Sequence, residues 1–210
     1  MSTRRSQASL ALVGGGHPRP PSDAEVTDGL SAGEGWAVAA AWHRFAPMVL
    51  TMAERALGSR SEAEDIAQEV FCAVYRKAST LREPDKLRSF VYSFAIRMLK
   101  SELRRRKVRS WLSFHTPEAL VDMSSRSLDV ESRDLLRRFY GVLERLSPRD
   151  RLVFTLRHME SMTIEEVAST MNLSISTVKR SAKHAETRLS RWCRADAGLA
   201  HLFEQKRWDP

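Results

Sequence analysis

The apolar residues of this chain recur at helical spacing in two stretches, and a polar segment without any period separates them. The first stretch runs from Trp36 to about Lys107, and the second from 133 to about 195. Buried-type residues follow one another at steps of three and four, which places them on one face of an α-helix. No stretch alternates as a β-strand does. The pattern predicts an all-α protein of two small helical domains joined by a flexible linker. Breaks are expected inside the first domain at Pro47, Gly58 to Ser61 and Glu83 to Pro84.

Three segments fall outside these two domains, 36–107 and 133–195. Residues 1–35 mix Ser, Gly and Pro without an apolar period, which predicts a disordered N-terminal tail. Residues 108–132 are polar and aperiodic, so they are interpreted as the linker. Residues 196–210 form a short C-terminal tail whose order the sequence does not define.

Two short helices with almost no chain between them are predicted in "TIEEVASTMNLSISTVKRS", residues 163–181. Thr163 is a helix N-cap, and Glu166 completes a capping box with it. Asn172 tolerates the left-handed backbone conformation that a sharp helix end requires, and Ser174 is a fresh N-cap. This spacing predicts a helix-turn-helix, whose second helix can enter the major groove of duplex DNA.

The second helix of this pair has an apolar face and a basic face. The predicted packing stripe is Ile175, Val178, Ala182, Ala185, Leu189 and Trp192. Basic side chains attract DNA phosphates, and those in the first turns of a groove-bound helix can reach base edges. An αα-hairpin with a solvated basic face is the alternative. The candidate residues for duplex DNA are Ser176, Thr177, Lys179, Arg180, Lys183 and His184.

An acidic strip is predicted on the helix within "SRSEAEDIAQEVFCAVYRK", residues 59–77. Ser61 and Glu64 are expected to form its capping box. Its buried stripe is Ile66, Val70, Ala73 and Val74, and its acidic residues lie on another face, at Glu62, Asp65 and Glu69. Carboxylates repel DNA phosphate, so the strip favours a protein partner, with an ordinary solvated surface as the alternative.

A basic face beside aromatic residues is predicted for "LRSFVYSFAIRMLKSELRRRK", residues 87–107. The expected buried residues are Leu87, Val91, Phe94, Met98 and Leu99, and the basic face holds Arg97, Lys100, Arg104 and Lys107. Phe90 and Tyr92 lie nearby. Such a surface suits single-stranded or melted nucleic acid, because an unstacked base can lie on an aromatic ring. The alternative is that the aromatics belong to the core.

The composition narrows the function classes. Lys and Arg outnumber Asp and Glu by 34 to 26, a formal net charge of +8, which fits a polyanionic partner. Cys72 and Cys193 have no Cys or His nearby at metal-ligand spacing, so neither a disulfide framework, a metal site nor a cofactor is predicted. No carboxylate cluster, phosphate loop or nucleophile–base pair indicates an enzyme. Without a signal peptide or a membrane span, a soluble cytoplasmic protein is expected.

Three segments, taken in order, resemble the successive regions of a bacterial RNA polymerase sigma factor of the sigma-70 family. They are "HRFAPMVLTMAERALGSRSEAEDIAQEVFCAVYRK", "LRSFVYSFAIRMLKSELRRRK" and "LERLSPRDRLVFTLRHMESMTIEEVASTMNLSISTVKRSAKHAETRL". The resemblance covers about Trp36 to Trp192 and is greatest to the small extracytoplasmic-function (ECF) group. Three ordered motifs are far more specific than any one of them.

This resemblance implies a transcription initiation factor that binds core RNA polymerase and directs it to promoter DNA. Asp65, Gln68 and Glu69 match the pattern that binds the clamp helices of core polymerase. The segment Ser79 to Lys86 corresponds to a loop that pockets a flipped base, and the helix-turn-helix would read the upstream element as duplex. An anti-sigma protein is a candidate further partner. The residues matched to the melted promoter element are Phe90, Arg97, Lys100 and Arg104.

The chain also departs from the family pattern. Phe90 stands where the family usually has Trp, Arg97 stands where it has Asn, and the recognition helix reads "TVKRSAKHA" where "TVKSRLHRA" is typical. These changes affect which promoter sequence is read and leave the role intact. An independent helix-turn-helix regulator would explain residues 147–192 and leave the acidic strip without a purpose. Such a regulator binds its operator alone, whereas this kind of sigma factor needs polymerase.

Overall fold

The computed structural model describes residues 19–112 and 129–203, and the regular elements of these ranges are helices, which confirms the predicted fold class. The first domain holds α1 (Asp23–Ala32), α2 (Gly35–Leu57), α3 (Arg60–Lys77), the 3₁₀ turns η1 (Ala78–Thr80) and η2 (Pro84–Lys86), and α4 (Leu87–Leu112). The second holds α5 (Val130–Leu143), α6 (Pro148–Phe154), the π turn η3 (Thr155–Met159), α7 (Ile164–Met171), α8 (Ile175–Ala195) and α9 (Ala200–Phe203).

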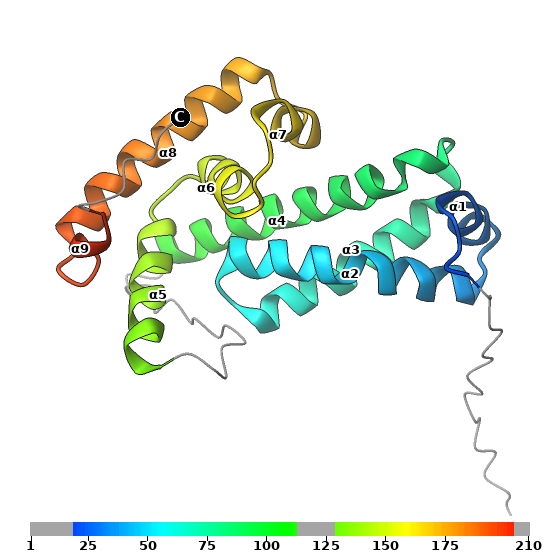
Figure 1. Cartoon of the computed structure of the whole chain (residues 1–210), viewed down its shortest axis with the longest axis horizontal. Helices are drawn as coiled ribbons and strands as arrows, with labels where there is room; N and C mark the ends of the chain where they lie inside the picture. Colours follow the sequence, from blue (N-terminus) through cyan, green and yellow to red (C-terminus); the bar gives the residue numbers. More distant parts are fainter. Residues whose placement is uncertain (1–18, 113–128, 204–210) are drawn as a thin grey trace, which may run out of the picture.

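Helices α2, α3 and α4 run lengthwise beside one another and bury their apolar faces together (Figure 1). The stripe predicted on α3 is confirmed, because its four residues are at most 7% exposed. On α4, Leu87, Val91 and Leu99 are fully buried, whereas Met98 is only half-buried. Each fully buried side chain of this size contributes about 1.5–3 kcal/mol to folding.

Two predicted details of the first domain are wrong. Helix α2 continues through Pro47, which is exposed, so the carbonyl that loses its hydrogen bond can face water. The N-cap of α3 is Ser59, whose side chain accepts from the backbone N–H of Glu62. The predicted cap, Ser61, lies inside the helix. Ser59 is itself buried, so packing of the turn decides between the two serines.

The boundaries of the predicted tail and linker also change. Residues 23–32, expected within a disordered tail, form α1, which Ser22 and Glu25 begin with a capping box. Helix α4 extends to Leu112 and α5 begins at Val130, so both helices enter the segment assigned to the linker. Residues 1–18 and 113–128, which hold the rest of the predicted tail and linker, lie outside the described residues.

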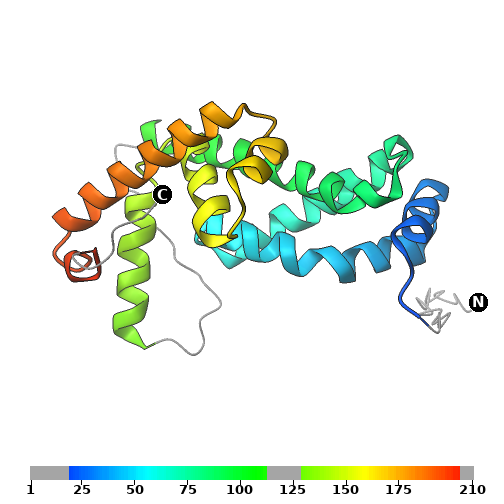
Figure 2. The ribbon, with the colours of Figure 1, turned by 45° about the horizontal axis from the view of Figure 1, so that its top comes forward.

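The two domains pack against each other. Helices α6 and α7 lie over α4 on the side away from α3 (Figures 1 and 2), and one apolar cluster continues from α2, α3 and α4 into α6, α7 and α8. Arg55 of α2 forms a 2.9 Å ion pair with Glu160, just beyond the π turn. Arg106 of α4 donates to the carbonyl of Leu57 at 2.7 Å and lies 3.5 Å from Glu144. Polar and apolar contacts therefore close the first domain onto the second.

Gly58 marks a close approach between the domains. It ends α2 in the left-handed conformation, with φ 72°, which glycine adopts without the steric cost of a Cβ atom. A Cβ atom built there would lie 2.6 Å from the ring of Tyr140 on α5. Tyr140 is 4% exposed and belongs to a second apolar cluster with residues of α6 and α8. Glycine therefore provides both the turn and the room for this ring.

Candidate nucleic-acid interface

The helix-turn-helix forms where the sequence predicts it. Thr163 and Glu166 make both bonds of the capping box of α7. Asn172 adopts the left-handed conformation with φ 53°, and the side chain of Ser174 accepts from the N–H of Thr177 to begin α8. The N–H of Leu173 bonds to the carbonyl of Ala168 at 2.9 Å, which closes the turn. The first turns of α8 therefore project from the domain.

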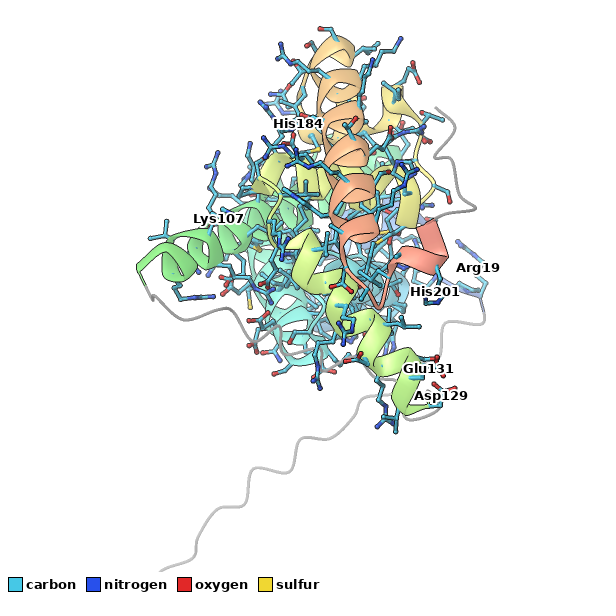
Figure 3. The ribbon with its side chains drawn as sticks, turned by 90° about the vertical axis from the view of Figure 1, so that its left-hand side faces the viewer. Arg19, Lys107, Asp129, Glu131, His184 and His201 are labelled. Carbon is cyan, nitrogen blue, oxygen red and sulfur yellow. The ribbon has the colours of Figure 1, made fainter. Side chains whose placement is uncertain are left out.

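The basic face of α8 is open to solvent. Lys179, Arg180 and Lys183 are exposed, and Figure 3 shows nitrogen-tipped side chains around this helix. By contrast, the labelled residues at the start of α5, Asp129 and Glu131, are acidic. Ser176 is exposed and Thr177 half-buried, and both hydroxyls bond to the side chain of Ser174. The residues buried on the other face are Val178, Ser181, Ala182, Ala185, Leu189 and Cys193.

Ile175 and His184 differ from their predicted surroundings. Ile175, expected in the packing stripe, is 45% exposed because it is the first residue of α8 and extends past the core. His184 Nδ1 lies 2.8 Å from Asp150 Oδ2, a carboxylate of α6 that is almost fully buried. Burial favours the neutral carboxyl, but the hydrogen bond with His184 helps to lower the pKa of Asp150 below its usual value. His184 thus ties α8 to α6 through one ring nitrogen.

The candidate surface on α4 combines aromatic and basic side chains. Phe90 is half-buried and meets Phe94 edge-on, with ring centroids 5.0 Å apart. The guanidinium of Arg97 lies 5.0 Å from the centre of the Phe94 ring, a cation–π contact that holds an exposed side chain over the aromatic pair. Arg104 is exposed on the same face and Lys100 is half-buried. The ring of Phe90 is partly core and partly available surface.

The acidic strip of α3 is accessible at Asp65 and Glu69, whereas its third carboxylate, Glu62, is half-buried and pairs with Arg106 of α4. Asp65, Gln68 and Glu69 are all exposed, and they lie off the buried stripe of the helix. Exposed Tyr75 follows on the same helix, and Trp42 of α2 packs on Phe71 with ring centroids 4.9 Å apart. This face therefore offers carboxylates, an amide and aromatic edges to a partner.

Sequence reasoning missed the buried arginine between the domains. Arg151 of α6 is 3% exposed, and its Nε donates to the carbonyl of Ala56 in α2 at 2.7 Å. Burial, with the nearby positive charge of Arg106, lowers the pKa of Arg151 to about 10, so it stays charged at neutral pH. Nothing in "SPRDRLVF" distinguishes this arginine from a solvated one, because its partner lies 95 residues away.

Across 19–112 and 129–203, His, Cys, Asp and Glu side chains form no group that could hold a metal ion. Within these ranges, no helix is both long and apolar enough to span a bilayer.

The fold and its exposed basic helix define a two-domain helical protein of the DNA-binding class. Residues 41–109 match the family model "Sigma-70 region 2", and residues 136–189 match "Sigma-70, region 4". The ferric citrate uptake sigma factor FecI of Escherichia coli is 30% identical over 132 residues, which cover 60% of this chain and 72% of that protein. The chain belongs to the sigma-70 family of RNA polymerase sigma factors, in the ECF group.

Two other relatives are also RNA polymerase sigma factors. The probable ECF sigma factor SigI of Mycobacterium tuberculosis is 28% identical over 162 residues, 73% of this chain; the chain spans only about half, 54%, of SigI. The RNA polymerase sigma-E factor of Streptomyces coelicolor is 28% identical over 141 residues, 67% of this chain and 77% of that protein.

Chains from two solved structures share the fold at 20% identity. CnrH, solved in complex with the cytosolic domain of CnrY, aligns with a TM-score of 0.58 over 83% of this chain and 99% of its own. RpoE of Bartonella quintana, solved with the anti-sigma factor NepR, aligns with a TM-score of 0.55 over 74% of this chain and 95% of its own. The similarity extends over both helical domains of the present chain.

Proposed function

We propose that this protein is a transcription initiation factor that binds core RNA polymerase and directs it to specific promoters. The observation that supports this most is the presence of both sigma-70 regions, in order, in a chain whose basic α8 and acidic α3 faces are both exposed. A protein that bound only DNA would gain nothing from the acidic face, because carboxylates repel phosphate. The two faces therefore fit two different partners.

The upstream promoter element would be read as duplex by α8. Arg180, in the second turn of the helix, is suited to reach a guanine edge, whereas Lys179 and Lys183 are suited to phosphates. Ser176 and Thr177 are available near the helix start, although their hydroxyls are shared with the cap residue Ser174. His184 contributes less in this proposal because its Nδ1 is already bonded to Asp150.

The melted promoter element would bind along α4. Arg97, Lys100 and Arg104 recur at steps of three and four, so their charges can follow the backbone of one strand. Phe90 offers part of a ring on which an unstacked base can lie. Arg97 would contact phosphate without leaving Phe94, since its cation–π contact keeps it extended over that ring.

Core polymerase would bind the acidic strip of α3. Asp65 and Glu69 supply negative charge, and Gln68 between them supplies both a donor and an acceptor. RpoE of Bartonella quintana, which shares this fold, was solved in complex with the anti-sigma factor NepR. An anti-sigma protein is accordingly part of the proposal for this chain too.

Footprinting tests the role of the protein as a whole. Core polymerase would hold the two domains at a fixed spacing, so the binding of one promoter element raises the effective concentration of the other. Run-off transcription on genomic fragments first identifies a promoter. That promoter DNA is then footprinted with the protein alone, with core polymerase alone and with both together. A sharp footprint is expected only from the mixture. A sharp footprint from the protein alone at physiological salt would favour an independent regulator.

Variants of two exposed acidic faces test the polymerase contact. Asp65→Lys with Glu69→Lys should weaken core binding about tenfold or more without loss of helicity, because both residues lie off the buried stripe. Glu131→Lys, an exposed reversal at the start of α5 (Figure 3), is the control and should bind core normally. Equal affinity of the double variant and the control would contradict the assignment of α3.

Variants of α8 test the reading of the duplex element. Arg180→Ala should cost about 1–3 kcal/mol at the promoter and relax the preference for one base pair. Lys183→Ala should weaken all sequences alike and lower the salt slope by about one unit. Binding is measured by titration of promoter DNA with the polymerase complex at several salt concentrations. If Arg180→Ala leaves base preference unchanged, another residue of α8 reads the element.

A further inference from the structure

Helix α1 lies outside the part of the chain that matches the sigma-70 regions. The region 2 match begins at residue 41, whereas α1 spans Asp23–Ala32. It lies at the end of the first domain where α3 turns into α4, and both views place it beside that turn (Figures 1 and 2). Its contacts are with α2 and with both 3₁₀ turns, η1 and η2.

Contacts along its length hold α1 firmly in this place. Val26 is fully buried and Leu30 is 4% exposed. Gly29 lies so close to α2 that an added Cβ atom would be 2.7 Å from the Cβ atom of Ala37. Arg44 of α2 forms an ion pair with Asp23 and donates to the carbonyl before Ser22. The helix is therefore an integral part of the first domain.

The C-terminal end of α1 supports the segment between α3 and α4. Ser31 Oγ donates to the carbonyl of Ala78 at 3.4 Å, and the N–H of Leu81 donates to the same carbonyl at 2.9 Å. Leu30 belongs to the same apolar cluster as Ala78 and Leu87, which flank the segment, and Leu81 packs on this cluster. Helix α1 thus underlies one end of the loop Ser79–Lys86.

This loop has little regular structure of its own to fix its shape. It contains the end of η1 and all of η2, two 3₁₀ turns whose hydrogen-bond geometry is poorer than that of an α-helix. Most of its side chains are exposed, with Leu81 and Pro84 half-buried. A segment of this kind opens locally unless neighbouring elements hold it. The contacts with α1 are therefore expected to determine how ordered the loop is before DNA arrives.

We propose that α1 positions the loop Ser79–Lys86 so that the loop can take up an unstacked base of the melted promoter strand. The inference rests on the proposed function, in which the first domain binds the melted promoter element, and on the resemblance that matches this loop to one that pockets a flipped base. Leu30 and Ser31 act as positioning residues through Ala78 and Leu81, and they do not touch DNA themselves. Since a preformed loop loses less conformational entropy when it binds, α1 raises affinity for the single strand.

The test compares Leu30 variants in the full chain bound to core polymerase. The probe is forked promoter DNA, taken from the promoter that run-off transcription identifies, with 2-aminopurine at successive positions of the single strand. Leu30→Ala should bind the fork about tenfold more weakly, because about one more residue of the loop must lose its conformational entropy on binding. It should also lose the rise in 2-aminopurine fluorescence that accompanies capture of the base. Leu30→Met, which keeps the volume, should restore both. Asp28→Ala, an exposed change on the same helix, is the control.

Two further measurements separate positioning from general damage. Affinity for core polymerase and for the duplex upstream element should stay within about twofold of the wild type in every variant, because α3 and α8 hold those surfaces. Amide exchange of Leu81, whose N–H bonds to Ala78, should speed up in Leu30→Ala and not in Asp28→Ala.

The outcomes distinguish this inference from the function on which it rests. If the wild-type complex binds the fork and Leu30→Ala binds it equally well, α1 does not position the loop and the inference is wrong. An equal loss for fork, duplex and core would also overturn it, since α1 would then serve only the stability of the domain. If the complex of the wild-type chain with core polymerase binds no forked promoter DNA, the proposed function itself is wrong.

Discussion

The closed packing of the two domains can be tested at Gly58, where α2 meets the ring of Tyr140. Replacement by alanine adds a single methyl group where α2 approaches Tyr140 closely. An alanine at φ 72° is strained by about 1–2 kcal/mol, wherever Tyr140 lies. The methyl group would also lie 2.6 Å from the ring, and such overpacking costs about 1–3 kcal/mol more. Gly58→Ala should therefore lower the free energy of unfolding by about 2–5 kcal/mol.

Gly33 provides a matched control for the backbone strain. It ends α1 with φ 77°, yet a Cβ atom there would meet only the Tyr75 hydroxyl, at an ordinary 3.6 Å. Gly33→Ala should therefore cost only the strain of about 1–2 kcal/mol. The difference between Gly58→Ala and Gly33→Ala estimates the free energy of the contact with Tyr140.

A double-mutant cycle then isolates the contact between the domains. Tyr140→Ala alone should cost about 3–5 kcal/mol, as for other buried aromatic residues, but it makes room for the methyl group at Gly58. The double variant should consequently be about 1–3 kcal/mol more stable than the sum of the two single changes predicts. Unfolding in denaturant measures all four proteins, and the shared apolar cluster predicts one transition. A coupling below about 0.5 kcal/mol would mean that Tyr140 does not lie on Gly58 in solution.

Two more predictions concern buried titratable groups. Cys193 is fully buried, and burial raises the pKa of its thiol to about 11. At neutral pH a thiol reagent should therefore label exposed Cys72 quickly and Cys193 only when α8 opens. Equally fast labelling of both cysteines would contradict the packing of α8. The hydrogen bond with His184 helps to hold the pKa of Asp150 below 3.8, so the stability that this carboxylate contributes is present above that pH and is lost as the pH falls below it. Asp150→Asn should flatten this acid limb in denaturant titrations from about pH 5 to about pH 2, and an unchanged slope would show that the carboxylate contributes nothing.

The sequence alone specified the helix-turn-helix closely. The capping box of Thr163 and Glu166, the left-handed Asn172 and the N-cap Ser174 are all present as predicted. These features could be predicted because each depends on bonds between residues at most five positions apart, so a short stretch of sequence contains both partners. The same approach failed at Ser61, because Ser59 also has a glutamate three residues later and only packing selects it.

The candidate site was predictable as helix faces and not as an assembled surface. The exposure of Asp65, Glu69 and Arg180 follows from the periodicity of their own helices. The bond between His184 and Asp150 could not be foreseen, because it joins two helices whose relative placement the pattern leaves open. The roles of these residues with DNA and polymerase stay predictions.

Tertiary structure alone decided how the parts meet. Residues 23–32 form α1 because α2 and the turns before α4 cover its apolar side. The surrounding sequence is rich in Gly and Pro, and it does not reveal that these elements pack there. Arg151 is buried for a similar reason, since the carbonyl that receives its Nε–H belongs to Ala56, 95 residues away. Periodicity determines which face of a helix is apolar, whereas the element that covers this face depends on shape and contacts across the whole chain.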